Sequence, residues 1–187
     1  MHETSLLHAA LELQNFFEEH HWKYAFIGGL ANLRWGQPRT TEDIDSTLLT
    51  SFVGEELVID TILSKFSARI LDAKEFAINY RVLLLATSNG IGADVSLGGI
   101  PFEEQLVKRA TMFEFCDGFI LRTCSAEDLV VLKAFAARDK DWADVRQILE
   151  KQKGYLDLEY IRHHLRLLVE LKEEPEIMVR LESMLDR

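Results

Sequence analysis

The fold of this chain is decided by the stretch Phe26-Ile-Gly-Gly-Leu-Ala-Asn-Leu-Arg-Trp-Gly-Gln-Pro-Arg-Thr-Thr-Glu-Asp-Ile-Asp45. It predicts a short apolar strand over 24–27, two glycines, at least one turn of helix, a Gly-Gln-Pro break and a second strand that carries Asp43 and Asp45. Residues two apart on a strand point to the same face, with Cα atoms roughly 6–7 Å apart. Both carboxylates therefore point one way, and Ile44 between them faces the core.

The paired carboxylates and the glycine pair before them predict a site for a metal ion and a phosphate. Oxygen ligands on a rigid strand suit hard divalent cations such as Mg²⁺, which binds through one or two carboxylates plus substrate phosphates. The Gly28-Gly29 pair ahead of a helix lets backbone N–H groups approach an anion at the positive end of that helix. The alternative is a tight turn followed by a solvated acidic strand end.

A third carboxylate comes from a predicted hairpin further along the chain. Residues 81–87 are almost continuously apolar, which is typical of a central strand buried on both faces, and a neighbouring strand over 91–97 carries Asp94. A lone charge beside the core is costly unless a metal or hydrogen bonds satisfy it. If the hairpin sets Asp94 near Asp43 and Asp45, the three form one acidic cluster that repels itself until a cation arrives. The alternative is a surface aspartate at a strand end.

Composition sets the broad class of the protein. Its 187 residues, 48% of them hydrophobic, favour one domain or one domain with a helical appendage. The net charge of −10 tells against non-specific nucleic-acid binding but leaves room for a nucleic-acid substrate held at a local patch. No apolar stretch approaches the ~20 residues of a membrane span, and the first residues lack a signal peptide, so we expect no membrane partner and a cytoplasmic protein.

The spacing of apolar residues in the last third of the chain predicts helices. We therefore predict a core over 1–124 and a helical C-terminal region over 125–187 packed on it. Within the otherwise apolar helix over 126–137 lies Lys133. A lysine there either extends outward so that its ammonium reaches water, or has a functional role.

Two sets of motifs resemble known families. The Gly-Gly pair, the short helix, the Asp-x-Asp strand and the later Asp94 resemble the nucleotidyltransferase superfamily. The segment Ser125-Ala-Glu-Asp-Leu-Val-Val-Leu-Lys-Ala-Phe-Ala-Ala-Arg-Asp-Lys-Asp-Trp-Ala-Asp144 is similar to the later motifs of AbiEii-type nucleotidyltransferases, which are abortive-infection toxins. The pattern is matched there by four residues: Lys133, Arg138, Asp141 and Asp144.

The resemblance, which spans roughly residues 22–150, implies both a fold and a reaction. The fold is α/β (α+β), a mixed sheet flanked by helices and followed by a helical C-terminal part. The reaction is transfer of a nucleoside monophosphate from an NTP to an acceptor hydroxyl, with two Mg²⁺ ions, or Mn²⁺ in their place.

The resemblance also implies roles for individual residues. Asp43 and Asp45 hold the metal ions together with Asp94, which holds or activates the acceptor hydroxyl. Asp141 acts as a base or lies in a network with Lys133, which contacts the triphosphate. The other expected nucleotide-binding residues are Gly28, Gly29, Arg39, Thr40 and Thr41, and Arg39 either orders the Asp-x-Asp loop or touches phosphate.

The sequence leaves the acceptor open. One reading is the toxin of a toxin–antitoxin pair that modifies tRNA or a protein and binds an antitoxin. A second is a small-molecule nucleotidyltransferase of the antibiotic-modifying kind, since an acidic protein suits cationic acceptors. A third is a nucleotide-binding module that has lost turnover, against which the intact set of three aspartates weighs. Gly29 stands where many members of the superfamily have Ser, which removes a possible hydroxyl contact to phosphate.

Overall fold

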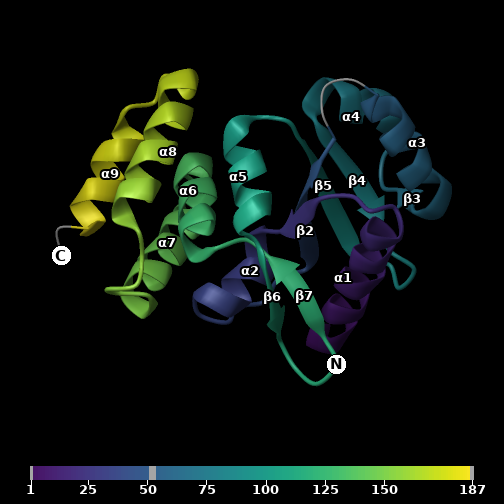
Figure 1. Ribbon diagram of the computed structural model, residues 1–187, viewed down its shortest axis with the longest axis horizontal. Helices are drawn as coiled ribbons and strands as arrows, with labels where there is room; N and C mark the ends of the chain where they lie inside the picture. Colours follow the sequence, from purple (N-terminus) through teal and green to yellow (C-terminus); the bar gives the residue numbers. More distant parts are fainter. Residues whose placement is uncertain (1, 51–53, 186–187) are drawn as a thin grey trace. The chain divides into compact units, whose positions relative to one another are not determined.

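The computed structural model describes residues 2–50 and 54–185 (Figure 1). Along the chain the described elements are α1 (His2–Glu19), β1 (Tyr24–Phe26), α2 (Gly28–Trp35), β2 (Asp43–Leu49), α3 (Glu55–Lys65), β3 (Ser67–Ala68), α4 (Ala73–Tyr80), β4 (Val82–Ala86), β5 (Gly92–Gly98), α5 (Pro101–Arg109), β6 (Thr111–Glu114), β7 (Ile120–Thr123), α6 (Ala126–Ala136), α7 (Asp139–Lys151), α8 (Leu158–Lys172) and α9 (Glu176–Leu185).

The chain divides into two compact units. The first comprises Met1–Leu30 and Thr40–Cys124, and the second comprises Ala31–Arg39 and Ser125–Arg187. The chain passes from one unit to the other inside α2, after Arg39 and after Cys124. The ranges 1–124 and 125–187 stay a prediction, and residues 1, 51–53, 186 and 187 of them lie outside the described part of the chain.

The first unit is built on one mixed sheet. Its strands lie in the order β3-β4-β5-β2-β1-β7-β6. The pairs β2–β5 and β1–β7 are parallel, and the other neighbouring pairs are antiparallel. The predicted mixed sheet with flanking helices is therefore confirmed, and so is the predicted hairpin, whose strands are β4 and β5.

One face of this sheet is covered by an apolar core. Inward-facing side chains alternate along the strands with a period of two, and α1 packs over β7 and β2. The ring of Phe17 on α1 lies 5.2 Å from that of Tyr24, and Phe16 lies 5.2 Å from Phe66 at the end of α3. The fully buried strand residues on this face include Phe26, Ile44, Leu48, Leu83, Leu85, Ala93 and Val95.

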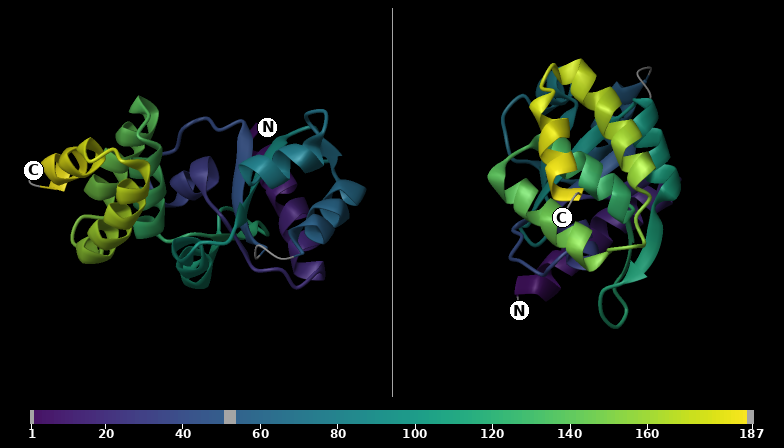
Figure 2. Two further views of the ribbon diagram at one scale, coloured as in Figure 1. Left: turned by 90° about the horizontal axis from the view of Figure 1, so that it is seen from above. Right: turned by 90° about the vertical axis from the view of Figure 1, so that its left-hand side faces the viewer.

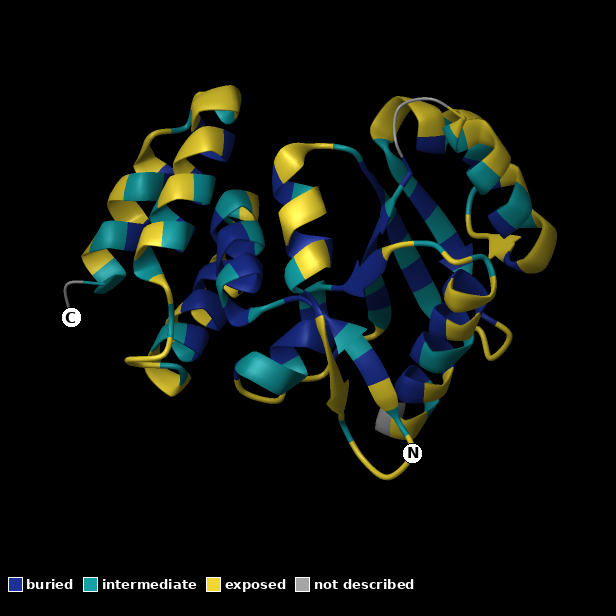
Figure 3. Ribbon diagram, in the orientation of Figure 1, coloured by how far each residue is buried: buried dark blue, intermediate teal, exposed yellow. Residues whose placement is uncertain are grey.

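The opposite face is only partly covered. Along β4, Leu83 and Leu85 are buried whereas Val82, Leu84 and Ala86 are partly exposed, an alternation that Figure 3 shows as dark blue and teal bands. The prediction that residues 81–87 are buried on both faces is therefore wrong. An apolar run can occupy a strand with one open face, because apolar atoms also contribute much of a protein's accessible surface.

The second unit contains α6 to α9. Ser125 caps α6, since its hydroxyl accepts a hydrogen bond from the backbone N–H of Asp128 at 3.2 Å. The helix α6 packs on α7 and α8, and α8 packs beside α9 (Figure 2). None of the helices in the described part of the chain combines the length and the apolar character that crossing a bilayer requires.

Candidate functional site

Three carboxylates meet on the open face of the sheet. Asp45 on β2 lies directly opposite Asp94 on β5 in a parallel register, and Asp43 precedes Asp45 by two residues on the same face. Each of the three offers a carboxylate oxygen, and these oxygens lie within 4.8 Å of one another. All three residues are partly exposed. The structure thus brings together the three aspartates that the sequence singled out.

A cation from outside the predicted motifs joins this cluster. Arg69, just after the edge strand β3, pairs its guanidinium with the carboxylate of Asp94. Gly92 leaves room for it, because a Cβ atom at Gly92 would lie 3.0 Å from Nη1 of Arg69. No sequence pattern indicated this contact, since Arg69 lies in no motif and is 25 residues from Asp94 in the chain.

The surroundings of Asp94 raise the pKa of its carboxyl group. Partial burial raises the pKa of the Asp94 carboxyl, the neighbouring Asp43 raises it further, and Arg69 lowers it without cancelling the increase. Three carboxylate oxygens at this spacing are the ligand type that Mg²⁺ and Mn²⁺ prefer. The residues present therefore fit a divalent cation.

Gly28 sits directly against this cluster. Its φ is +56°, in the left-handed region that favours glycine, and a Cβ atom there would lie 1.9 Å from Oδ2 of Asp45. Because Gly28 also begins α2, the first turn of that helix approaches the carboxylate without an intervening side chain. This close approach explains why a glycine is required at the first position of the helix.

Gly29 is packed against Thr41 instead. A Cβ atom at Gly29 would lie 2.2 Å from Oγ1 of Thr41, whose hydroxyl donates a hydrogen bond to the backbone carbonyl of Asp43 at 3.3 Å. The neighbouring Thr40 is exposed. The threonine hydroxyl thus stands close to the position that a serine side chain at residue 29 would need.

The second unit holds its own buried ionic cluster. Lys133 on α6 is only 5% exposed, and its Nζ lies 2.6 Å from Oδ2 of Asp144 and 3.4 Å from Oδ1 of Asp141, both on α7. The reading in which this lysine extends outward to water is wrong. Its ammonium is instead enclosed with two carboxylates, as a network with Asp141 would require.

Two arginines complete this cluster. Arg138 pairs with Asp141, and Arg39 donates to Asp144 from Nε at 3.1 Å and from Nη2 at 3.0 Å. Burial acts to raise the pKa of Asp144, but the hydrogen bonds and charges of Arg39 and Lys133 outweigh it and hold that pKa below its ordinary value. Asp144 is therefore a carboxylate that stays ionised although it is buried.

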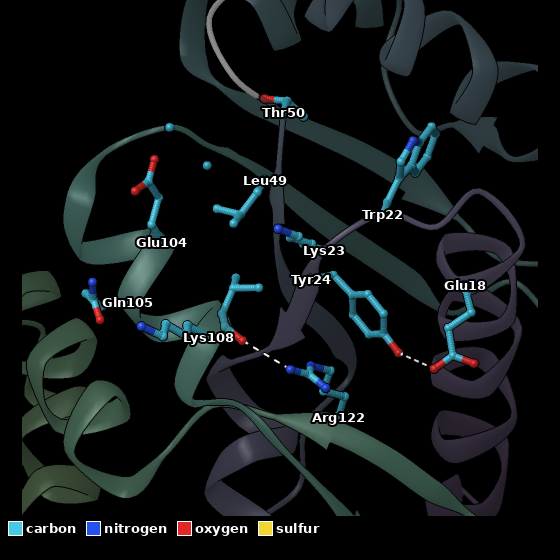
Figure 4. Close-up of a pocket in the computed structure, with 13 residues that line it drawn as sticks. Glu18, Trp22, Lys23, Tyr24, Leu49, Thr50, Glu104, Gln105, Lys108 and Arg122 are labelled. Atoms are coloured by element: carbon cyan, nitrogen blue, oxygen red, sulfur yellow. Dashed lines mark hydrogen bonds between the residues drawn. The ribbon is translucent and has the colours of Figure 1, made fainter.

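A separate cleft of about 1,210 Å³ lies elsewhere in the first unit (Figure 4). It borders Leu49 and Thr50 at the far end of β2 from Asp43, and its lining includes the charged residues Glu18, Lys23, Glu104, Lys108 and Arg122. In Figure 4 the side chain of Tyr24 donates to Glu18, and that of Arg122 donates to the carbonyl of Val107. None of the predicted site residues lines this cleft.

The sheet order and the acidic cluster on its open face define a protein of the nucleotidyltransferase class. The chain belongs to the family described as "Nucleotidyl transferase AbiEii toxin, Type IV TA system", whose model matches residues 10–186. The resemblance to AbiEii-type nucleotidyltransferases is therefore confirmed. No curated protein matches the chain.

Two solved structures are similar in fold. An antigenic nucleotidyltransferase-like protein from Paracoccidioides brasiliensis is 15% identical with a TM-score of 0.56, covering 97% of this chain and 94% of its own. The antibiotic-resistance factor ANT(2'')-Ia is 17% identical with a TM-score of 0.56, covering 94% of this chain and 97% of its own. At these identities the likeness shows the nucleotidyltransferase fold.

Proposed function

We propose that this nucleotidyltransferase moves a nucleoside monophosphate from an NTP to an acceptor hydroxyl in a reaction that depends on Mg²⁺, with two ions bound and Mn²⁺ as a substitute. The observation that carries the proposal is the convergence of three carboxylate oxygens within 4.8 Å on the open face of the sheet. Asp43, Asp45 and Asp94 would hold the ions. Divalent cations bound there would stabilise the charge that develops on the attacking and leaving oxygens.

Side chains of the protein would hold the acceptor, take its proton and bind the nucleotide. Asp94 would hold the acceptor hydroxyl or take its proton, as that oxygen bonds to the α-phosphorus and pyrophosphate leaves. Asp141 would act as a base or through its network with Lys133. The proposed nucleotide-binding residues are Gly28, Gly29, Arg39, Thr40 and Thr41, and Lys133 would contribute to nucleotide binding directly or through its buried partners.

We further propose that the protein acts as the toxin of a toxin–antitoxin pair in the cytoplasm, with tRNA or a protein as the acceptor and an antitoxin protein as a partner. Membership of the AbiEii toxin family supports this reading. A second candidate acceptor is a cationic small molecule. The net charge of −10 favours it, and ANT(2'')-Ia, an antibiotic-resistance factor, has the same fold over nearly its whole length.

Label transfer tests the proposed function. The protein is incubated with each α-labelled NTP, Mg²⁺ and total cell extract, and the label is followed into RNA, protein and small molecules. We expect label in one of these fractions, and its loss with EDTA and with Asp45→Asn. Label in RNA or protein supports the toxin reading, and label in a metabolite supports the second candidate. A protein that binds an NTP but transfers label to none of these fractions would be a nucleotide-binding module that has lost turnover. That result would contradict the proposal.

A further inference from the structure

The side chains of Lys133, Asp144 and Arg39 form a line from the interior of the second unit to its surface. The side chain of Lys133 is 6% exposed and that of Asp144 is 3% exposed, whereas that of Arg39 is 37% exposed. Asp144 lies between the two cations, so one carboxylate joins a buried ammonium to a guanidinium at the surface.

The carboxylate of Asp144 accepts hydrogen bonds from both cations. Oδ2 of Asp144 accepts from Nζ of Lys133 at 2.6 Å and from Nη2 of Arg39 at 3.0 Å, and Oδ1 accepts from Nε of Arg39 at 3.1 Å. The guanidinium is therefore held by two parallel bonds, which fix its plane as well as its position. Lys133 has three N–H donors, and its ammonium is already shared between Asp144 and Asp141.

This arrangement limits what Lys133 can do directly. An enclosed ammonium that contacts two buried carboxylates has little access to a triphosphate, and moving it would break its ion pairs with both. The side chain of Arg39 also pairs with Asp144, but it is more than a third exposed and is therefore more accessible to a ligand. A planar guanidinium also suits phosphate oxygens better than an ammonium does. In the chain, Arg39 precedes Asp43 by four residues.

We propose that Asp144 is a positioning residue through which the buried Lys133 fixes the guanidinium of Arg39, and that Arg39 is the cation that contacts the NTP phosphates. The inference rests on the proposed function, since it assumes that an NTP binds. It gives Lys133 an indirect role in place of the direct triphosphate contact that the family pattern implies. Holding Arg39 in one orientation before the nucleotide arrives lowers the ordering cost of binding.

A mutant cycle of NTP affinities tests whether Lys133 and Asp144 act through Arg39, an arrangement called the relay below. Affinity for ATP, GTP, CTP and UTP, each with Mg²⁺, is measured by calorimetry on the full chain carrying Arg39→Gln, Asp144→Asn, Lys133→Met and the pairwise combinations. We expect Arg39→Gln to weaken binding of the preferred NTP by roughly 10- to 100-fold, the effect of losing a charge-assisted hydrogen bond. Asp144→Asn and Lys133→Met should weaken it in the same direction, and the double variants should lose no more than Arg39→Gln alone.

The matched control is Glu182→Gln, which removes the carboxylate from another two-pronged arginine pair of the second unit, Arg162 with Glu182 at 2.9 Å. This change should leave NTP affinity unaltered, and thermal melting of every variant separates lost binding from lost folding. If Lys133→Met does not fold, Arg39→Lys replaces it as the test variant. Arg39→Lys keeps the positive charge at residue 39 but cannot make the two parallel hydrogen bonds to Asp144. It should weaken binding as well.

Three results would overturn the inference. If the fold-losses of NTP affinity in Arg39→Gln and in Lys133→Met multiply in the double variant, Lys133 contacts the nucleotide independently of Arg39. Unchanged affinity in Asp144→Asn would mean that Asp144 positions nothing. In both cases the proposed function stands, because the wild-type protein binds an NTP. A wild-type protein that binds none of the four NTPs would overturn the proposed function and the relay together.

Discussion

Asp45 and Asp94 face each other across the parallel strands β2 and β5, with Asp43 one strand repeat away. Two carboxylates directly opposite on one face repel each other, and such a pair destabilises a sheet unless a cation lies between or beside them. Arg69 supplies one such charge at Asp94. A bound divalent cation would supply more, which makes the cluster the first place to test.

Replacing one cluster residue should separate chemistry from folding. Asp45→Asn removes a charge with little change in shape, so we expect loss of more than 99% of turnover, about 3 kcal/mol of transition-state stabilisation. The melting temperature should be unchanged or higher because repulsion is relieved. Glu42→Gln, an exposed carboxylate on the same segment, is the control and should keep turnover. Wild-type label transfer by Asp45→Asn would contradict the assignment.

Removing Arg69 should favour metal binding. Its guanidinium occupies the Asp94 carboxylate, so a cation must compete with it for that ligand. We expect Arg69→Gln to bind Mg²⁺ or Mn²⁺ several-fold more tightly in the absence of nucleotide, measured by calorimetry. Lys65→Gln on α3, an exposed lysine of the same unit, should not change the affinity. Weaker metal binding by Arg69→Gln would show that the arginine supports the site instead.

The glycine that begins α2 should tolerate no side chain. Gly28→Ala forces a Cβ atom to within 1.9 Å of the Asp45 carboxylate at a φ of +56°, so Asp45 must move. We expect a loss of stability of about 2–3 kcal/mol and a large loss of turnover. Gly90→Ala isolates the backbone strain, since its φ is +82° and no atom lies within 4 Å of the new Cβ. It should cost about 1 kcal/mol and keep turnover. Equal effects of the two changes would argue against the close approach.

The second glycine should show a specific coupling to Thr41. Gly29→Ser introduces the residue that many superfamily members carry, but its Cβ atom would lie 2.2 Å from the Thr41 hydroxyl oxygen. We expect a loss of about 1–3 kcal/mol in urea unfolding. Thr41→Gly clears that space, so the double variant should be more stable than the sum of the single changes predicts. Simple additivity would mean that the two positions do not compete for space.

The buried carboxylate of the second unit should make stability depend on pH. Because the folded protein holds the pKa of Asp144 below its ordinary value of 3.8, the contribution of this carboxylate to stability is fully present above that value and is lost as pH falls through the lower folded pKa. At pH 7, Asp144→Asn should lower the free energy of unfolding by about 3 kcal/mol. The difference from wild type should shrink near pH 3.

Urea unfolding at both pH values measures this difference. The control is Asp139→Asn, whose carboxylate is fully exposed on the same helix and which should leave the free energy of unfolding nearly unchanged. A wild-type advantage over Asp144→Asn that is the same at pH 7 and pH 3 would contradict a lowered pKa.

Local patterns in the sequence determined most of the elements and the acidic set. Two-residue periodicity placed Asp43 and Asp45 on one face and Ile44 on the other, and the glycine pair marked the start of α2. The hairpin that carries Asp94 could be read from an apolar run, a turn and a second run. These signals survive in a single sequence because side-chain direction along a strand depends only on residue spacing.

Packing between elements far apart in the chain sets which face of the sheet is open and which groups surround each charge. The run over 81–87 looked buried on both sides, yet β4 leaves one side partly exposed, because coverage depends on which helices pack there. Whether Lys133 points outward or inward depended on Asp141 and Asp144 lying across from it on another helix. The contacts of Arg69 and Arg39 have the same origin, since both join residues far apart in the chain, and the distance between such residues is set by packing.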